Sequence, residues 1–197
     1  MTKRVAVFVS GGGTNLQTLL DAQSSGLLHS GAIALVISSK PEVYALERAK
    51  KAGVPAFAVP RKELGLEGFE ARTLELLEEY RIDYMVTAGF LTIFSEGFIK
   101  RFPNKMINVH PALIPAFCGK GYYGLRVHEA ALERGVKLTG ATVHFVNEVC
   151  DGGPIIAQKG VEVLPGDTPE TLQRRVMEQA EWVLLPRALE MVCAGEL

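Results

Sequence analysis

An asparagine and a histidine stand two residues apart at the end of an apolar segment. Asn108 lies within the strand-like run 106–109, His110 directly follows this run, and Pro111 comes next. Because side chains alternate along a strand, Asn108 and His110 project on the same face. Pro111 disfavours helical backbone at His110, so a helix cannot follow directly. Histidine exchanges protons near neutral pH and a carboxamide donates to a developing oxyanion, so this pair suits chemistry that passes through an oxyanion.

Plainer explanations of the polar residues stay open at this point. A histidine at a strand end is more often a packed residue than a catalytic one, and this applies to His110. Asp151, in an Asp-Gly-Gly-Pro segment, fits an Asx turn as well as a reacting carboxylate. His144 lies within a strand-like segment, where we interpret it as structural. His128 is expected on a short helix.

A glycine-rich turn, Ser10-Gly-Gly-Gly-Thr-Asn15, follows the apolar run 5–9. Glycines let backbone N–H groups approach a ligand, and the positive end of a following helix favours an anion such as phosphate. Thr14 and Asn15 add side-chain donors. A plain strand-to-helix turn with Thr14 as N-cap is an equally good explanation. Leu16 replaces the third glycine of the dinucleotide fingerprint and no Walker A loop is present, so a functional turn would hold a single phosphate.

Alternating strand and helix patterns fill the first half of the chain. Buried strands are expected at 5–9, 32–37, 55–59 and 83–87. Helices are expected from Leu16 onward, at 44–52 and at about 69–80. This alternation predicts βαβ units around a parallel sheet, in which ligands bind beyond the carboxyl ends of the strands.

The second half is organised differently. Strands are expected at 106–109, 140–146 and 154–159, with a loop at 115–124 and a turn at 147–153. A helix is expected at 168–194, with Asp167 or Thr168 as N-cap and Pro186 kinking or dividing it. We predict an α/β fold: one domain over residues 1–197, with a doubly wound, mostly parallel sheet and helices on both faces.

Composition narrows the function classes. The 197 residues fit one domain, and 48% hydrophobic with 22% charged residues is ordinary for a globular protein. A formal charge of −1 gives no basic excess for nucleic acid or membrane binding. No segment approaches the ~18 apolar residues of a membrane span, so we expect a cytoplasmic protein. The three cysteines and four histidines show no metal-ligand spacing, so we expect no metal site and no disulfide framework.

Four segments resemble the glycinamide ribonucleotide formyltransferases, and the likeness covers nearly the whole chain. In order they are Ser10-Gly-Gly-Gly-Thr-Asn-Leu-Gln17, Ala88-Gly-Phe90, the segment 107–115 and the segment 140–154. The Asn-x-His-Pro and Asp-Gly-Gly-Pro sequences are typical of the wider formyl-transferring superfamily. The Gly-x-Gly-Thr-Asn turn is more specific to the branch that uses a ribonucleotide.

The resemblance implies transfer of the formyl group of 10-formyltetrahydrofolate to the amine of glycinamide ribonucleotide in de novo purine biosynthesis. The amine is implied to attack directly, through a tetrahedral intermediate. The folate is then a co-substrate and no metal is required. The implied partners are these two small molecules, with no nucleic acid or membrane partner, and the chain is expected to be a monomer or a homodimer.

The resemblance also implies roles for individual residues. The catalytic residues are Asn108, His110 and Asp151, with Asp151 favouring a protonated His110. The residues that bind the substrate phosphate and ribose are Gly12, Gly13, Thr14, Asn15 and Glu181. The residues that bind the folate are Leu91, Thr92, Ile93, Phe94, Asn108, Val146 and Asp151. Residues 1–100 are thus expected to form a phosphate-binding half, and residues 101–197 a folate-binding and catalytic half.

The chain departs from the family pattern at several positions. Basic residues are common in the family where Thr92 and Leu66 stand here. The loop 116–124 is longer than in many members and carries Lys120, whose charge is available to replace one that is lost. Cys150 stands where an aliphatic residue is usual. These differences affect peripheral contacts and leave the three catalytic positions complete.

Two other classes of function are alternatives to this one. Methionyl-tRNA formyltransferases, sugar-nucleotide formyltransferases and formyltetrahydrofolate hydrolases share the chemistry. The tRNA enzymes and the hydrolases add a further domain, for which we expect no room in this chain. A catalytically silent phosphate- or nucleotide-binding module is the rival from another class. The presence of Asn108, His110 and Asp151 together argues against it.

Overall fold

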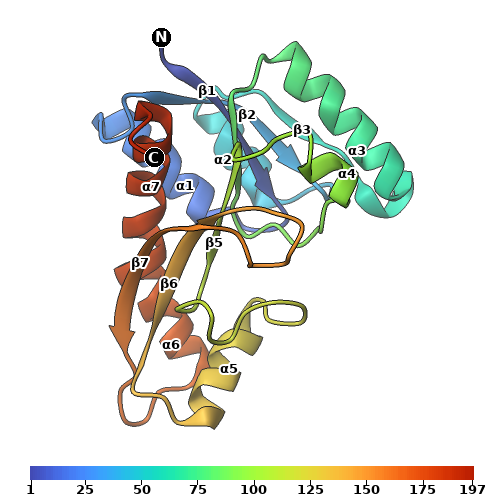
Figure 1. Ribbon diagram of the computed structural model, residues 1–197. Coiled ribbons are helices and arrows are strands. Elements are labelled where there is room, and N and C mark those ends of the chain that lie inside the picture. The colour runs from blue at the N-terminus through green and yellow to red at the C-terminus, as the bar shows by residue number, and fades with distance from the viewer.

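The computed structural model describes residues 1–197 and contains one seven-stranded sheet (Figure 1). The strands are β1 (Lys3–Val9), β2 (Gly31–Ser38), β3 (Ala56–Ala58), β4 (Tyr84–Thr87), β5 (Met106–His110), β6 (Leu138–Phe145) and β7 (Ile155–Glu162). Their order across the sheet is β3-β2-β1-β4-β5-β6-β7. Pairs from β3 to β5 are parallel, whereas β6 and β7 join antiparallel. The mostly parallel sheet is confirmed.

Helices cover both faces of this sheet. They are α1 (Thr14–Ser25), α2 (Tyr44–Lys51), α3 (Arg61–Glu79), α4 (Glu96–Ile99), α5 (Leu125–Arg134), α6 (Pro169–Val176), the π-helix η1 (Met177–Glu181) and α7 (Trp182–Ala194). Side chains of β1 alternate between two cores: Val5, Val7 and Val9 pack in the larger one, Ala6 and Phe8 in the smaller one. The larger core takes residues from α1, α2, α6 and α7, and the smaller from α3 and α4. The doubly wound arrangement is therefore confirmed.

The strand order places a crevice where the site residues lie. β1 sits between β2 and β4, so the chain winds outward in one direction from β1 to β3 and in the other from β4 onward. The loops after β1 and β4 diverge at this point, which is where open α/β sheets bind ligands. The loops after β5 and β6 extend toward the same region (Figure 1).

The C-terminal helix differs from its prediction. Thr168 is the N-cap, in a reciprocal capping box with Thr171. Pro186 does not divide the helix, because it lies buried inside α7. The helix is interrupted upstream by η1, where the N–H of Trp182 bonds to the carbonyl of Met177, five residues back. A widened turn of this kind is common near functional sites.

One further helix was not predicted. The short helix α4 begins after Ser95, whose hydroxyl accepts a hydrogen bond from the N–H of Phe98. Four residues are too few to show helical periodicity in the sequence. None of the helices is both long enough and apolar enough to cross a bilayer.

Candidate active site

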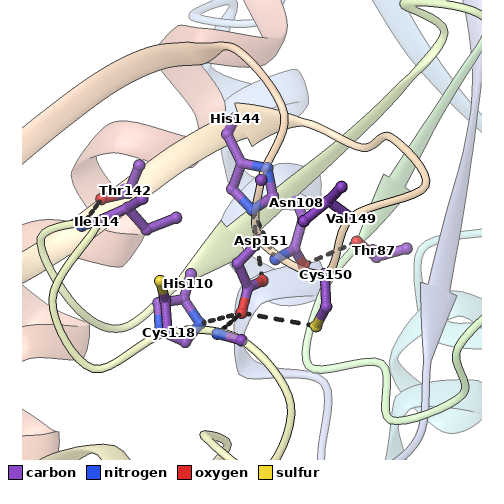
Figure 2. Close-up of polar contacts among 12 residues, drawn as sticks. Thr87, Asn108, His110, Ile114, Cys118, Thr142, His144, Val149, Cys150 and Asp151 are labelled. Carbon is purple, nitrogen blue, oxygen red and sulfur yellow. Dashed lines mark hydrogen bonds and ion pairs between the residues drawn. The ribbon is translucent and has the colours of Figure 1, made fainter.

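Three neighbouring strands bring polar side chains together at the carboxyl end of β5 (Figure 2). In the sheet register Thr87 of β4 pairs with Asn108, and Asn108 pairs with His144 of β6. His110 lies on the same face of β5 as Asn108. Asp151, from the loop between β6 and β7, points into this row. The two residues that the sequence singles out at 108 and 110 therefore stand in a larger polar cluster.

Hydrogen bonds on both sides fix the carboxamide of Asn108. Thr87 Oγ1 donates to Asn108 Oδ1 at 2.8 Å. His144 Nδ1 lies 2.8 Å from the carbonyl oxygen of Phe145, which only accepts, so Nδ1 carries the proton. His144 Nε2 then accepts from Asn108 Nδ2 at 3.2 Å. One of the two Nδ2 protons remains for a ligand.

Asp151 lies between two imidazoles. Its Oδ2 accepts from the N–H of Gly119 at 2.8 Å and lies 3.6 Å from His110 Nδ1. Its Oδ1 lies 3.6 Å from His144 Nε2. Burial raises the pKa of Asp151, but the positive charge that His144 or His110 carries when protonated and the hydrogen bond from the Gly119 N–H outweigh it and hold the pKa below its usual range. The carboxylate is therefore ionised at neutral pH.

The loop that carries Asp151 is a tight turn. Asp151 has a φ of 54°, a conformation that aspartate tolerates better than most residues. A Cβ on Gly153 would lie 1.8 Å from the carbonyl oxygen of Phe145, so only glycine fits there. The Asx-turn explanation of Asp151 is wrong, because its carboxylate accepts from the Gly119 N–H and faces His110 and His144. Asn147 forms an Asx turn in this loop, accepting from the N–H of Val149 at 3.0 Å. This frees the Asp151 carboxylate for the cluster.

His110 is nearly buried, with 4% of its surface exposed. Its Nε2 lies 2.8 Å from the carbonyl oxygen of Phe117 and must donate to it. Burial lowers the pKa of His110, while Asp151 and the Phe117 carbonyl act in the opposite direction without compensating. Asp151 does favour the protonated ring, as expected, but burial prevails and the resting imidazole is biased toward its neutral form.

This balance predicts the titration of His110. Its pKa, measured by NMR on ¹⁵N-histidine-labelled protein, is expected below the ordinary value of 6.5. In Asp151→Asn the pKa should fall further, because the charge that favours the imidazolium is removed. A His110 pKa that is unchanged or higher in the variant would contradict this electrostatic account.

Two cavities meet at the cluster. The larger has a volume of about 520 Å³ and the smaller about 180 Å³. Residues that line both are Phe90, Ile93, Asn108, Cys150 and Asp151. Two ligands bound in these cavities would thus approach each other beside Asn108 and Asp151.

The larger cavity reaches the start of α1. The N-cap there is Gly13, with a φ of 73° and no side chain to bond the first-turn N–H groups. The alternative in which Thr14 caps the helix is therefore wrong. Asn15 Nδ2 donates to Glu181 Oε2 at 2.9 Å, and Asn15 Oδ1 is buried without a partner. Burial raises the pKa of Glu181, although the bond from Asn15 opposes this.

Comparison with known proteins adds to this geometry. Residues 3–189 match the model of the family described as formyl transferase. The chain belongs to the formyl transferase family. It is 40% identical to phosphoribosylglycinamide formyltransferase from Haemophilus influenzae, over 99% of this chain and 89% of that protein. It is also 40% identical to the chloroplastic phosphoribosylglycinamide formyltransferase of Arabidopsis thaliana, over 90% of this chain, but spans only 61% of that longer protein.

A solved formyl transferase structure has the same fold. Glycinamide ribonucleotide transformylase 1 from Symbiobacterium toebii superposes with a TM-score of 0.90 at 40% sequence identity. The match covers 98% of this chain and 89% of that one. The formyl transferase fold expected from the sequence is confirmed.

The formyl transferase fold brings most of the expected residues to the two cavities. Thr14, Asn15 and Glu181 line the larger cavity, whereas Gly12 and Gly13 form the turn before it and do not line it. Thr92, Ile93, Phe94 and Val146 line the smaller cavity, but Leu91 lines only the larger one. The ring of Phe94 is largely buried, stacked on Phe98 at 4.3 Å between centroids. Both cavities draw residues from both halves of the chain.

Three residues of the formyl transferase site escaped the sequence analysis. His144, interpreted as structural, contacts both Asn108 and Asp151. Thr87 orients Asn108. His128 lies on α5 as expected, but it also lines the larger cavity, fully buried and with neither ring nitrogen bonded. Burial lowers the pKa of His128 to about 4, so the ring is neutral. The pairing of Thr87 and His144 with Asn108 across strands is the signal that a single sequence lacks.

The structure shows no comparable arrangement of side chains for a metal ion. The structure gathers no group of three or more His, Cys, Asp or Glu side chains positioned to hold a metal ion. The exposed part of the larger cavity is lined by the loop 119–124, with Lys120, Tyr122 and Tyr123.

Proposed function

We propose that this chain transfers the formyl group of 10-formyltetrahydrofolate to the amine of glycinamide ribonucleotide, a reaction of de novo purine biosynthesis. One observation carries the proposal: two cavities meet at Asn108 and Asp151, with His110 in the wall of the larger one, and that larger cavity ends at a helix N-terminus with no side-chain cap. The names of the relatives agree with it. The two substrates would then meet at the residues able to stabilise an oxyanion.

The larger cavity is proposed to hold the ribonucleotide. Its phosphate would bind the N–H groups of the turn at Gly12, Gly13, Thr14 and Asn15, because the helix N-terminus favours an anion. Glu181, buried beside Asn15, would accept hydrogen bonds from the ribose hydroxyls. Asn15 Oδ1, which has no partner in the protein, lies at the same place.

The smaller cavity is proposed to hold the pterin ring of the folate donor. Leu91, Thr92, Ile93 and Phe94 would supply backbone groups on one side, and Val146 to Asp151 would close the other. The cavity is bordered by exposed apolar side chains, with Ile93 65% and Val149 64% exposed. A flat aromatic ring would cover this surface and reach Asn108 and Asp151.

The cluster explains how the transfer would proceed. The substrate amine forms a bond to the formyl carbon, and the formyl oxygen becomes an oxyanion. The free Nδ2 proton of Asn108 would stabilise this charge. A second proton on His110 would sit on Nδ1, facing Asp151, because Nε2–H already bonds Phe117. The oxyanion then collapses and the bond between the formyl carbon and the folate nitrogen breaks. One proton passes from the attacking nitrogen to the leaving folate nitrogen, and the His110–Asp151 pair provides a route.

Formyl transfer itself tests the proposal. Purified protein is mixed with 10-formyltetrahydrofolate and either glycinamide ribonucleotide, glycinamide without the ribose phosphate, or methionyl-tRNA. We expect saturable transfer to the ribonucleotide only. Transfer to another acceptor, or release of formate without an acceptor, would reassign the chain to a different branch of the family. Binding of both ligands without any transfer would favour a silent binding module.

Replacing Glu181 with glutamine is expected to separate stability from binding. The folded-state pKa of Glu181 is raised, so its ionised form destabilises the fold above pH 4.5 and not below it. The neutral glutamine should therefore raise the melting temperature by about 2–4 °C at pH 7 and by little at pH 4. The KM for the ribonucleotide should rise about tenfold, because a charged acceptor is lost.

Glu178→Gln is the matched control for this experiment. It removes the same charge from an exposed position of η1. Its melting temperature and KM should stay near the wild-type values. A lower melting temperature of Glu181→Gln at pH 7 would show that the buried carboxylate stabilises the ligand-free protein, contrary to this account.

A further inference from the structure

The turn before α1 is held from behind by α2. The Gly11 carbonyl accepts from the N–H of Ala45 at 3.3 Å, and the Gly12 carbonyl accepts from Arg48 Nε at 2.8 Å. A Cβ on Gly13 would lie 2.6 Å from Ala45 Cβ, so the turn lies in direct contact with α2 and only glycine fits there. Helix α2 therefore fixes two consecutive peptide groups of the turn.

Three contacts fix the guanidinium of Arg48. Besides Gly12, its Nη1 donates to Gln17 Oε1 at 2.9 Å. Its central carbon lies 4.9 Å from the ring centroid of Tyr44, in a cation–π contact. Gln17 is itself held, since its Nε2 donates to Asp21 Oδ1 at 2.8 Å. The planar guanidinium suits this role, because it holds its Nε and Nη1 donors in fixed directions, whereas the donors of a lysine ammonium rotate about a flexible stem.

Peptide geometry gives this arrangement a consequence for ligand binding. The C=O and N–H of a trans peptide point in opposite directions, and both peptides of the turn are trans. Because the carbonyls of Gly11 and Gly12 point toward α2, the N–H groups of Gly12 and Gly13 point away from it. They lie beside the uncapped first turn of α1. Consecutive N–H groups turned to one side form an anion-binding concavity.

We propose that Arg48 is a positioning residue of the phosphate site: it holds the Gly12–Gly13 peptide so that its N–H faces a phosphate monoester. The proposal rests on the proposed function, in which the ligand is the phosphate of a ribonucleotide. An independent sign of a ligand beside this turn is Asn15, 8% exposed, whose Oδ1 has no protein partner and can accept a hydrogen bond from a ligand hydroxyl such as that of a ribose. Without the bond from Arg48, the Gly12–Gly13 peptide would be free to rotate.

Binding of ribose 5-phosphate tests this role without the formyl donor. Calorimetry on Arg48→Met is expected to show a roughly 10-fold to 50-fold higher Kd than the wild type. Arg48→Lys should lose nearly as much, because it keeps the charge and loses the paired contacts. Lys51→Met is the matched control: Lys51 lies 5.6 Å from the same Tyr44 ring but makes no bond to the turn. Its Kd should change less than twofold.

NMR on ¹⁵N-glycine-labelled protein reports the peptide orientation directly. Ribose 5-phosphate should shift the amide signals of Gly12 and Gly13 downfield in the wild type and in Lys51→Met. These shifts should be lost or strongly reduced in both Arg48 variants, whose other amide signals confirm that the protein is folded. In formyl transfer, KM for the ribonucleotide should rise and kcat should stay within about threefold.

The outcomes separate this inference from the proposed function. Wild-type affinity in Arg48→Met would overturn the inference and leave the function standing. Normal affinity in Arg48→Lys, with a loss in Arg48→Met, would mean that charge alone acts, and would overturn the positioning role. Absence of formyl transfer with the expected ribose 5-phosphate results would overturn the function alone. No binding of ribose 5-phosphate by the wild type would overturn the phosphate site and the inference together.

Discussion

Replacing Asp151 with asparagine is expected to lower kcat for formyl transfer by about 10³-fold, within the range typical of a lost acid–base partner. The carboxylate is ionised at neutral pH and lies 3.6 Å from His110 Nδ1. Without it, the buried imidazole loses the charge that favours uptake of a proton during the reaction. The asparagine oxygen can still accept the Gly119 N–H, so the loop should keep its position.

Single-turnover rates and substrate affinities measure this effect separately. The Kd for each substrate should change less than about fivefold, because the change acts on proton transfer and not on the cavities. Glu133→Gln, which removes a carboxylate from an exposed position on α5, is the control and should keep wild-type rates. A kcat of Asp151→Asn within threefold of the wild type would exclude a catalytic role for this carboxylate.

Replacing Asn108 with alanine is expected to lower kcat by about 10²–10³-fold, the usual effect of losing one oxyanion donor. The variant also removes one partner of Thr87 Oγ1 and leaves His144 Nε2 without a hydrogen-bond donor, which should destabilise the fold by about 1–3 kcal/mol. Melting temperature, kcat and folate affinity together distinguish the two effects. If the affinity for folate fell by the same factor as kcat, Asn108 would act in folate binding and not in stabilising the oxyanion.

Thr87→Val provides a graded control for this prediction. It keeps the carboxamide and removes only the hydroxyl that donates to Asn108 Oδ1. A freed amide samples orientations in which Nδ2 points away from the substrate, so kcat should fall about tenfold at most. A larger loss in Thr87→Val than in Asn108→Ala would contradict the assignment of Asn108 as the donor.

The local pattern of apolar residues and glycines was sufficient to predict the parallel part of the fold. The continuous apolar run Val5–Val9 and the glycine turn after it are each specified by neighbouring residues, and β1 and α1 formed where expected. The antiparallel strands β6 and β7 were located, but periodicity carries no information on pairing direction. The interruption at η1 was missed because five residues are too few to change an apolar periodicity that is detected over a window of about 11–18 residues.

The same limit explains which site residues were found. Asn108, His110 and Asp151 were identified from a strand end, an Asp-Gly-Gly-Pro turn and a family resemblance. His144 was not, because its role depends on register: it pairs with Asn108 only when β5 and β6 run antiparallel. Arg48 was missed for a related reason, since its contact with Gly12 joins residues 36 positions apart. Contacts of this kind follow from packing and not from local sequence.

Formyl transfer by His110→Ala, measured against the wild type under single-turnover conditions, tests the central claim most directly. His29→Ala, which removes an exposed imidazole, is the control and should keep the wild-type rate. The account predicts that the rate of His110→Ala falls about 10²–10⁴-fold while both substrates still bind. A rate within threefold of the wild type would show that the cluster at the end of β5 does not carry out the transfer.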